Sequence, residues 1–227
     1  MKLFLASWFA GSAELLPDFA GEGLAGKRLV FIPTAARHKM PAEERAALDH
    51  INALDKNALL NLGFIVEELE VSDESCEVVE QRISAADAIF VCGGSTFFLL
   101  QELKRKGADK LIANHIKQGK LYMGTSAGSL LVQKDIIAEE GVEDPALGPE
   151  LNGDTSALGL VDFYMYVHYG SHFWGDDDEC YEKLYAPVNA IKISDKQAVT
   201  LDGEKVEVVT APGDLAEVLS WLEGFFQ

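Results

Sequence analysis

The residues best suited to covalent chemistry lie in the sequence Gly-Thr-Ser-Ala-Gly at positions 124–128. A short apolar run, 120–124, precedes this Gly-x-Ser-x-Gly pattern, and a helical pattern follows it. A serine at such a strand-to-helix turn is held in a strained conformation that exposes its hydroxyl, beside helix N–H groups that favour negative charge. We therefore predict that Ser126 is a nucleophile. The alternative is a glycine-rich turn with no catalytic serine.

A general base is expected at the end of another strand. His168 directly follows the apolar run 163–167, and an imidazole can take a serine proton and return it to a leaving group. His172 is the main rival. A metal site built from His168, His172 and Asp176–Asp178 is conceivable, but these residues lack a recognised ligand spacing, so we expect no metal.

A catalytic histidine also needs an acid that fixes its tautomer. Glu139 and Glu140 lie between the nucleophile and the base, at the start of the long acidic segment 138–159. Glu143 and Asp144 are further candidates. We expect Glu140 or Glu139 to serve, and the residues alone leave the choice open.

An oxyanion hole is expected beside the nucleophile. Gly93 and Gly94 follow the apolar run 88–92 and precede a helical pattern. The backbone N–H of Gly94 would face that of Ala127, and two such donors stabilise a tetrahedral oxyanion. The glycine pair alone would equally suit a tight turn.

Elements that could position these groups alternate along the chain. Helical patterns occupy 41–62, 76–86, 96–106 and 109–117, between apolar runs predicted as buried strands at 2–7, 28–33, 64–71, 88–92, 120–124 and 161–167. This alternation predicts one α/β domain over 1–227, with a mostly parallel sheet covered on both faces. Residues 190–193, 197–201 and 205–210 are expected to form a small antiparallel meander, and 214–225 a terminal helix. In such sheets, ligands bind at the carboxyl ends of the strands.

Composition limits the partners. The 227 residues contain 19 Lys and Arg against 37 Asp and Glu, a net charge of −18. Such a field repels phosphate backbones and anionic lipids, so neither nucleic acid nor a membrane surface is expected as a partner. Three scattered cysteines favour a reducing compartment, and we expect a cytoplasmic protein that is a monomer or a homodimer.

Four segments together resemble the peptidase E family of serine dipeptidases, to which cyanophycinase is related. They are 93–97 (Gly-Gly-Ser-Thr-Phe), 124–128, 158–169 and 191–199. The resemblance implies a three-layer α/β/α sandwich related to class I glutamine amidotransferases. It also implies Ser126 as nucleophile, His168 as base, and the Gly94 and Ala127 amides as the oxyanion hole. The family's third catalytic residue falls in the region matching 139–141.

Two departures from that family concern the substrate. The aspartyl dipeptidases have Asn where this chain has Ser95, and a basic stretch where this chain has the acidic residues 175–182. We therefore expect the acids near Asp176 to favour a substrate ammonium group rather than an aspartate. Ser95, Thr96 and His172 are the expected substrate-binding residues.

The predicted function is hydrolysis of short peptides by a dipeptidase-like serine peptidase. The reaction would pass through an acyl-enzyme on Ser126 and needs no cofactor. One alternative is an esterase of the α/β-hydrolase type, which shares the elbow and the order nucleophile, acid, base. Another is a catalytically inactive small-molecule-binding protein of the same fold.

Overall fold

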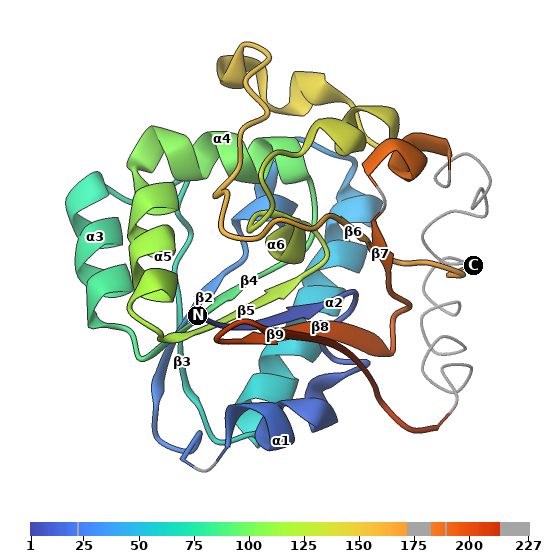
Figure 1. The fold of residues 1–227 in the computed structure, drawn as a ribbon. Helices are drawn as coiled ribbons and strands as arrows, with labels where there is room; N and C mark the ends of the chain where they lie inside the picture. The colour runs from blue at the N-terminus through green and yellow to red at the C-terminus, as the bar shows by residue number, and fades with distance from the viewer. Residues whose placement is uncertain (22, 172–182, 189, 214–227) are drawn as a thin grey trace.

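A seven-stranded sheet forms the centre of the computed structural model, which describes residues 1–21, 23–171, 183–188 and 190–213 (Figure 1). The strand order is β3-β2-β4-β5-β1-β8-β9. The first five strands in that order are parallel, whereas β8 runs antiparallel to β1, and β9 antiparallel to β8. The strands are β1 (Lys2–Ala6), β2 (Arg28–Ile32), β3 (Ile65–Glu68), β4 (Ala88–Val91), β5 (Leu121–Thr125), β8 (Gln197–Asp202) and β9 (Lys205–Thr210).

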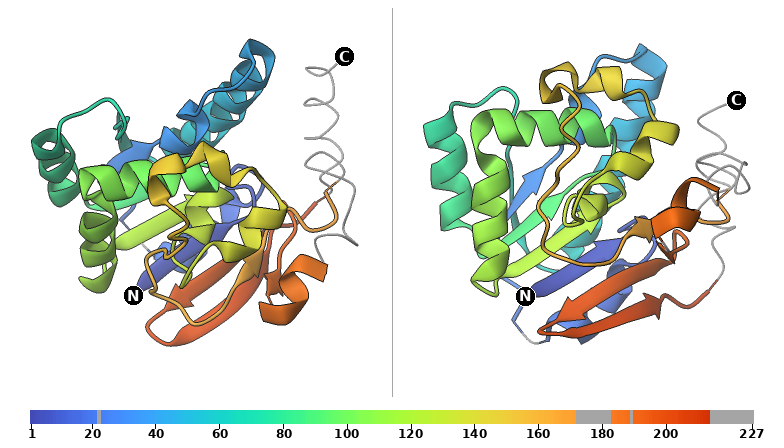
Figure 2. Two further views of the ribbon diagram at one scale, coloured as in Figure 1. Left: turned by 90° about the horizontal axis from the view of Figure 1, so that it is seen from above. Right: turned by 45° about the horizontal axis from the view of Figure 1, so that its top comes forward.

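Helices cover both faces of this sheet. They are α1 (Leu16–Ala20), α2 (Ala42–Asn61), α3 (Cys76–Ala85), α4 (Thr96–Lys106), α5 (Ala108–Lys117) and the short α6 (Ala127–Leu130). Helices α3, α4 and α5 lie on one face, while α1 and α2 lie on the other (Figures 1 and 2). The predicted three-layer α/β/α sandwich is therefore confirmed.

Two hydrophobic cores, one on each side of the sheet, hold these layers together. Along β1, Leu3 and Leu5 pack into the core between the sheet and helices α3, α4 and α5. Phe4 and Ala6 pack into the core between the sheet and helices α1 and α2. All four residues have no exposed surface. Since both faces of a central parallel strand are buried, the strand reads as a continuous apolar run rather than an alternating one. Each fully buried large side chain contributes roughly 1.5–3 kcal/mol.

The C-terminal strands differ from the predicted meander. Strands β8 and β9 form an antiparallel pair that extends the main sheet through β1 (Figure 2). Strand β7 (Ile191–Lys192) instead pairs in parallel with β6 (Met165–Tyr166) in a separate two-stranded sheet. Of the predicted strand 161–167, only the two residues of β6 form a strand. The backbone N–H groups of 158–161 instead donate to carbonyls of 131–133, just after α6.

The acidic segment 138–159 packs against the start of α4. It carries three 3-10 helices, η3 (Ile137–Gly141), η4 (Pro145–Leu147) and η5 (Pro149–Leu151). The Glu150 N–H donates to Gln101 Oε1 at 2.8 Å, which ties the segment to α4. The predicted helix 214–225 lies outside the described residues. In the part of the chain that the structure describes, no helix is long and apolar enough to cross a membrane.

Candidate active site

Ser126 occupies a strained turn between β5 and α6. Its φ of 50° and ψ of −120° lie in a region that costs about 1–3 kcal/mol for a residue with a side chain. The turn is held because the Ser126 N–H donates to the carbonyls of Ala6 and Ser7, at 3.1 and 3.0 Å. A Cβ at Gly128 would lie 2.1 Å from the Val91 carbonyl oxygen, so only glycine lets α6 start this close to β4. The predicted strand-to-helix elbow is therefore present.

His168 lies against this serine. Its Nε2 is 2.9 Å from Ser126 Oγ, although the two residues are 42 positions apart in the chain. The histidine also has a positive φ, 62°, and its backbone N–H donates to Ser7 Oγ at 2.7 Å. The predicted meeting of these two side chains at the carboxyl edge of the sheet is confirmed as geometry.

The other ring nitrogen of His168 contacts Asp195. The distance from Nδ1 to Asp195 Oδ1 is 2.6 Å, and Ser7 Oγ donates to the same oxygen at 2.8 Å. Asp195 is 2% exposed. Burial alone would raise the pKa of Asp195, but the hydrogen bonds and charge of His168, with the hydroxyls of Ser7 and Ser171, hold that pKa below its ordinary value. The carboxylate is therefore kept ionised beside the imidazole.

The expected orienting acids are not the ones that reach His168. Glu139 is buried in the wall of the site, where its carboxylate accepts a hydrogen bond from the Tyr185 hydroxyl, and burial raises its pKa to about 7. Glu140 is exposed. Ser126 Oγ and Asp195 Oδ1 contact the two ring nitrogens of His168, so the prediction that Glu139 or Glu140 orients this histidine is wrong.

Asp195 and Ser7 are the two residues that the sequence interpretation missed. The turn at 194–195 was visible only as a break between strands, and the apolar run 2–7 ended in a serine without any motif around it. The usable signal for Ser7 was its position at the carboxyl end of a central strand.

The glycine turn after β4 contributes backbone to the same site. Gly94 has a φ of 135°, and a Cβ there would lie 2.4 Å from the Ala35 carbonyl oxygen. That carbonyl accepts from the Ser95 N–H at 2.9 Å, whereas no backbone carbonyl among the described residues accepts from Gly94. Ala127 is the first residue of α6, so its N–H has no acceptor within the helix. Their joint role as an oxyanion hole stays a prediction.

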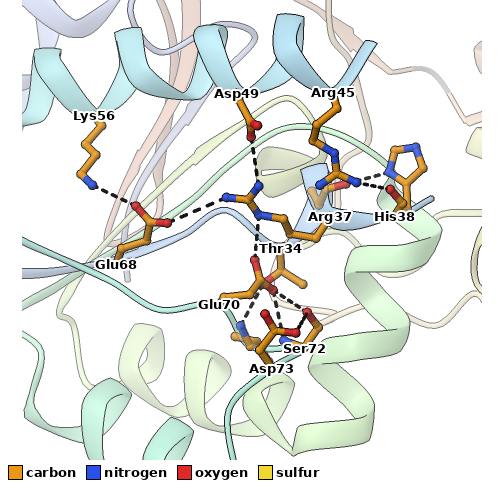
Figure 3. A network of polar contacts seen from close by, with 12 residues as sticks. Thr34, Arg37, His38, Arg45, Asp49, Lys56, Glu68, Glu70, Ser72 and Asp73 are labelled. Atoms are coloured by element: carbon orange, nitrogen blue, oxygen red, sulfur yellow. Dashed lines mark hydrogen bonds and ion pairs between the residues drawn. The ribbon is translucent and has the colours of Figure 1, made fainter. Parts of the chain in front are cut away.

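A polar network fixes the segment that supports this glycine turn. Arg37 is the last residue of the 3-10 helix η2 (Thr34–Arg37). Figure 3 shows it between Asp49 of α2 and two glutamates, one at the end of β3 and one two residues later. Its guanidinium lies 3.1 Å from Asp49, 3.9 Å from Glu68 and 3.4 Å from Glu70. Each of these partly exposed ion pairs contributes little, but together they anchor η2, which presents Ala35 to the turn at Gly94.

A cavity of about 360 Å³ opens beside Ser126 and His168. The expected substrate-binding residues Ser95 and Thr96 line it, as does His38. His172 and Asp176–Asp178, which include the expected ammonium-binding acids and the alternative metal ligands, lie outside the described residues. The apolar part of the lining consists of Trp8, Leu48, Ile51, Leu130, Val142, Leu147 and Val167.

Two acidic side chains line this cavity. Glu139 and Glu143 line it, and no lysine or arginine is among the described residues that do so. Residues 22, 172–182, 189 and 214–227 contain neither lysine nor arginine in the sequence. The cavity therefore combines apolar walls with two acidic side chains.

Comparison with known proteins agrees with the fold. The model of peptidase family S51 matches residues 6–209. An uncharacterized peptidase of Listeria monocytogenes is 38% identical over 206 residues, which cover 90% of this chain and 96% of the relative. A Drosophila melanogaster protein named a probable alpha-aspartyl dipeptidase is 29% identical over 209 residues, covering 85% of this chain and 80% of the relative.

A solved structure is similar over almost the whole chain. It is a 1.5 Å crystal structure of a candidate peptidase E protein from Listeria monocytogenes EGD-e. The TM-score is 0.83 and the identity 34%, over 93% of this chain and 98% of that one. With the family model spanning the elbow, His168 and Asp195, the chain belongs to peptidase family S51, the serine peptidases that include peptidase E and alpha-aspartyl dipeptidase.

Proposed function

We propose that this protein hydrolyses short peptides through an acyl-enzyme on Ser126. The observation that carries the proposal is the continuous hydrogen-bonded series Ser126, His168 and Asp195, with contacts of 2.9 and 2.6 Å. These lengths are those of good hydrogen bonds between a hydroxyl, an imidazole and a carboxylate. Such a series is what an activated serine requires.

In the acylation step, Ser126 Oγ attacks the carbonyl carbon of the substrate while its proton moves to His168 Nε2. Asp195 keeps the other proton on Nδ1, so that Nε2 is the basic nitrogen, and it stabilises the imidazolium that forms. The negative charge moves to the carbonyl oxygen, where the N–H groups of Gly94 and Ala127 stabilise it. His168 then gives the proton to the leaving amine, and the C–N bond breaks.

Deacylation repeats these events with water. His168 takes a proton from the water molecule, whose oxygen attacks the ester carbon on Ser126. The second tetrahedral intermediate collapses, Oγ recovers its proton from His168, and the carboxylic acid product leaves. No metal or cofactor takes part in this scheme.

The wall of the cavity favours short substrates. The segment from η3 to η4 supplies Glu139, Val142, Glu143 and Leu147 to one side of the cavity. Because this segment is tied to α4, it bounds the space beside Ser126. We infer that dipeptides fit better than long chains, in keeping with the dipeptidase-like character of the family.

The order of the three residues separates this proposal from the esterase alternative. In α/β-hydrolases the acid precedes the histidine in the chain. Here Asp195 follows His168, so the sequence-based expectation of nucleophile, acid, base does not describe this site.

A fluorophosphonate probe tests the chemistry directly. We expect stoichiometric labelling of the wild type at Ser126, no labelling of Ser126→Ala, and full labelling of Ser84→Ala, which removes an exposed serine from α3. Dipeptide hydrolysis should follow the same pattern. A folded wild type that neither reacts with the probe nor cleaves dipeptides would instead support a binding protein.

A further inference from the structure

Glu143 occupies the amino terminus of α4, inside the cavity. Its Oε1 accepts from the backbone N–H of Thr96 at 2.7 Å and of Phe97 at 3.0 Å. The start of a helix carries partial positive charge and free N–H groups, and it therefore binds anions. The protein's own carboxylate fills this position.

The remaining N–H groups of the first turn are also satisfied. The Phe98 N–H donates to Ser95 Oγ at 3.1 Å, and the N–H of the N-cap residue Ser95 donates to the Ala35 carbonyl at 2.9 Å. With Glu143 on the N–H groups of Thr96 and Phe97, all four free donors of α4 are taken. A substrate carboxylate would find no donor here and would meet a fixed carboxylate.

This position lies next to the expected oxyanion hole. Thr96 is two residues after Gly94 in the chain, and Glu143, Gly94 and Ser126 line the same cavity. A substrate whose carbonyl reacts with Ser126 therefore shares this cavity with Glu143. Burial raises the pKa of Glu143, while its hydrogen bonds from Phe97, Ser95 and Thr96 lower it. Burial has the larger effect, so the pKa of Glu143 lies above its ordinary value, and the position of its carboxyl group on the helix N–H groups is fixed by the hydrogen bonds.

No lysine or arginine of the described residues lies beside Glu143 in the cavity. Lysine and arginine are absent from the described lining residues, and the undescribed residues have neither in the sequence. The walls around Glu143 are instead apolar, with Val142 and Leu147 on its own segment. Such a space disfavours a side chain that carries a carboxylate.

We propose that Glu143 determines substrate preference: it fills the anion-binding end of α4, so the enzyme rejects a side-chain carboxylate and cleaves after residues that lack one. This inference rests on the proposed function and names its substrate class. It sets this chain apart from the Drosophila relative, whose name denotes an aspartyl substrate.

The test compares two substrates of nearly equal shape, Asn-Leu and Asp-Leu, which differ by one side-chain charge. For the wild type we expect kcat/KM to favour Asn-Leu by at least about tenfold, from repulsion between two carboxylates at close range. In Glu143→Gln the amide oxygen can still accept from Thr96 and Phe97, but the charge is gone. We expect the preference for Asn-Leu to fall about tenfold.

Glu140→Gln is the matched control, because it removes the same charge from an exposed residue of the same segment. Its preference should equal that of the wild type. A merely structural role of Glu143 would lower kcat/KM for both peptides equally and leave the preference unchanged, and that result would overturn the inference. So would a wild type that cleaves Asp-Leu as fast as Asn-Leu.

Binding separates this inference from the proposed chemistry. Calorimetry of the two peptides with Ser126→Ala and with Ser126→Ala/Glu143→Gln reports the charge preference without turnover. We expect tighter binding of Asn-Leu to the first protein and a smaller difference for the second. Equal binding of the two peptides to Ser126→Ala, or binding of neither, would overturn the role of Glu143. Failure of the proposed function would appear differently, as a wild type that the fluorophosphonate does not label.

Discussion

Asp195 Oδ1 lies 2.6 Å from His168 Nδ1 because two short strands run in parallel. His168 follows β6 and Asp195 follows β7, so the pairing of Tyr166 with Lys192 brings the residues after both strands to the same end. Strand β8 then starts beside the end of β1, where Ala198 pairs with Ala6. This second pairing brings Ser7 to the same carboxylate.

Asp195→Asn should abolish most of the activity while the fold survives. An asparagine can donate its N–H to Nδ1 and thereby stabilise the wrong tautomer, in which Nε2 carries the proton and cannot act as a base. We expect kcat to fall by roughly 10³–10⁴ with little change in KM. Steady-state kinetics on a dipeptide measures this. Asp202→Asn, an exposed change on β8, is the control, and equal losses in both variants would refute the role of Asp195.

Ser7→Ala tests a positioning residue that touches no substrate atom in the proposed reaction. It removes the hydroxyl that accepts from the His168 N–H and donates to Asp195. Loss of this support should misplace the imidazole and lower kcat by about 10- to 100-fold, with KM unchanged.

Ser12→Ala is a suitable comparison for Ser7→Ala. Ser12 is equally buried, at 0% exposure, but its hydroxyl donates to the backbone carbonyls of Trp8 and Phe9, at 3.2 and 3.4 Å. It should lower the melting temperature without lowering kcat. If the kcat of Ser7→Ala fell only in proportion to its folded fraction, the positioning role would be disproved.

Glu139 should make the preference for substrates with cationic side chains depend on pH. Its raised pKa of about 7 means that the carboxyl is neutral below pH 7 and negative above it. The kcat/KM ratio of Arg-Leu to citrulline-Leu, a charged side chain and its neutral counterpart, should therefore rise about 3- to 10-fold from pH 6 to pH 8. Glu139→Gln should flatten this rise and Glu140→Gln should keep it. A wild-type ratio that stays constant with pH would contradict the prediction.

Asp55 should make the protein less stable as the pH rises. This residue of α2 has no exposed surface, and burial raises its pKa to about 8, although the Ala10 N–H donates to Oδ1 at 2.8 Å. Because the native carboxyl keeps its proton while the unfolded one loses it, the free energy of unfolding falls between about pH 4 and pH 8.

Asp55→Asn should therefore stabilise the protein at pH 8 by on the order of 2–4 kcal/mol and change it little at pH 4, as followed by urea denaturation. Asp162→Asn, which removes an exposed carboxylate, should show no such pH dependence. A constant difference between Asp55→Asn and wild type across this range would rule out the titration of Asp55.

Local sequence determined most of the fold and half of the site. The strands at 28–32 and 88–91 and the helix at 96–106 match their apolar and helical patterns closely, because buried parallel strands and amphipathic helices leave distinct periodicities. The elbow at Ser126 was equally readable, since its glycines are required by contacts with the adjoining strand and helix. His168 was accessible because it ends an apolar run.

The partner of His168 was decided only by the tertiary structure. Nothing near Asp195 in the chain distinguishes it from the many other acidic residues, and Glu139 stood closer in sequence to the nucleophile. What selects Asp195 is strand pairing over long separations, β6 with β7 and β8 with β1, and such pairings depend on the whole sheet rather than on any local pattern. The same holds for Glu143, which accepts from the N–H of Thr96, 47 residues away in the chain. The carboxylate is visible in the sequence, but only the packing of its segment against α4 places it at the amino terminus of that helix.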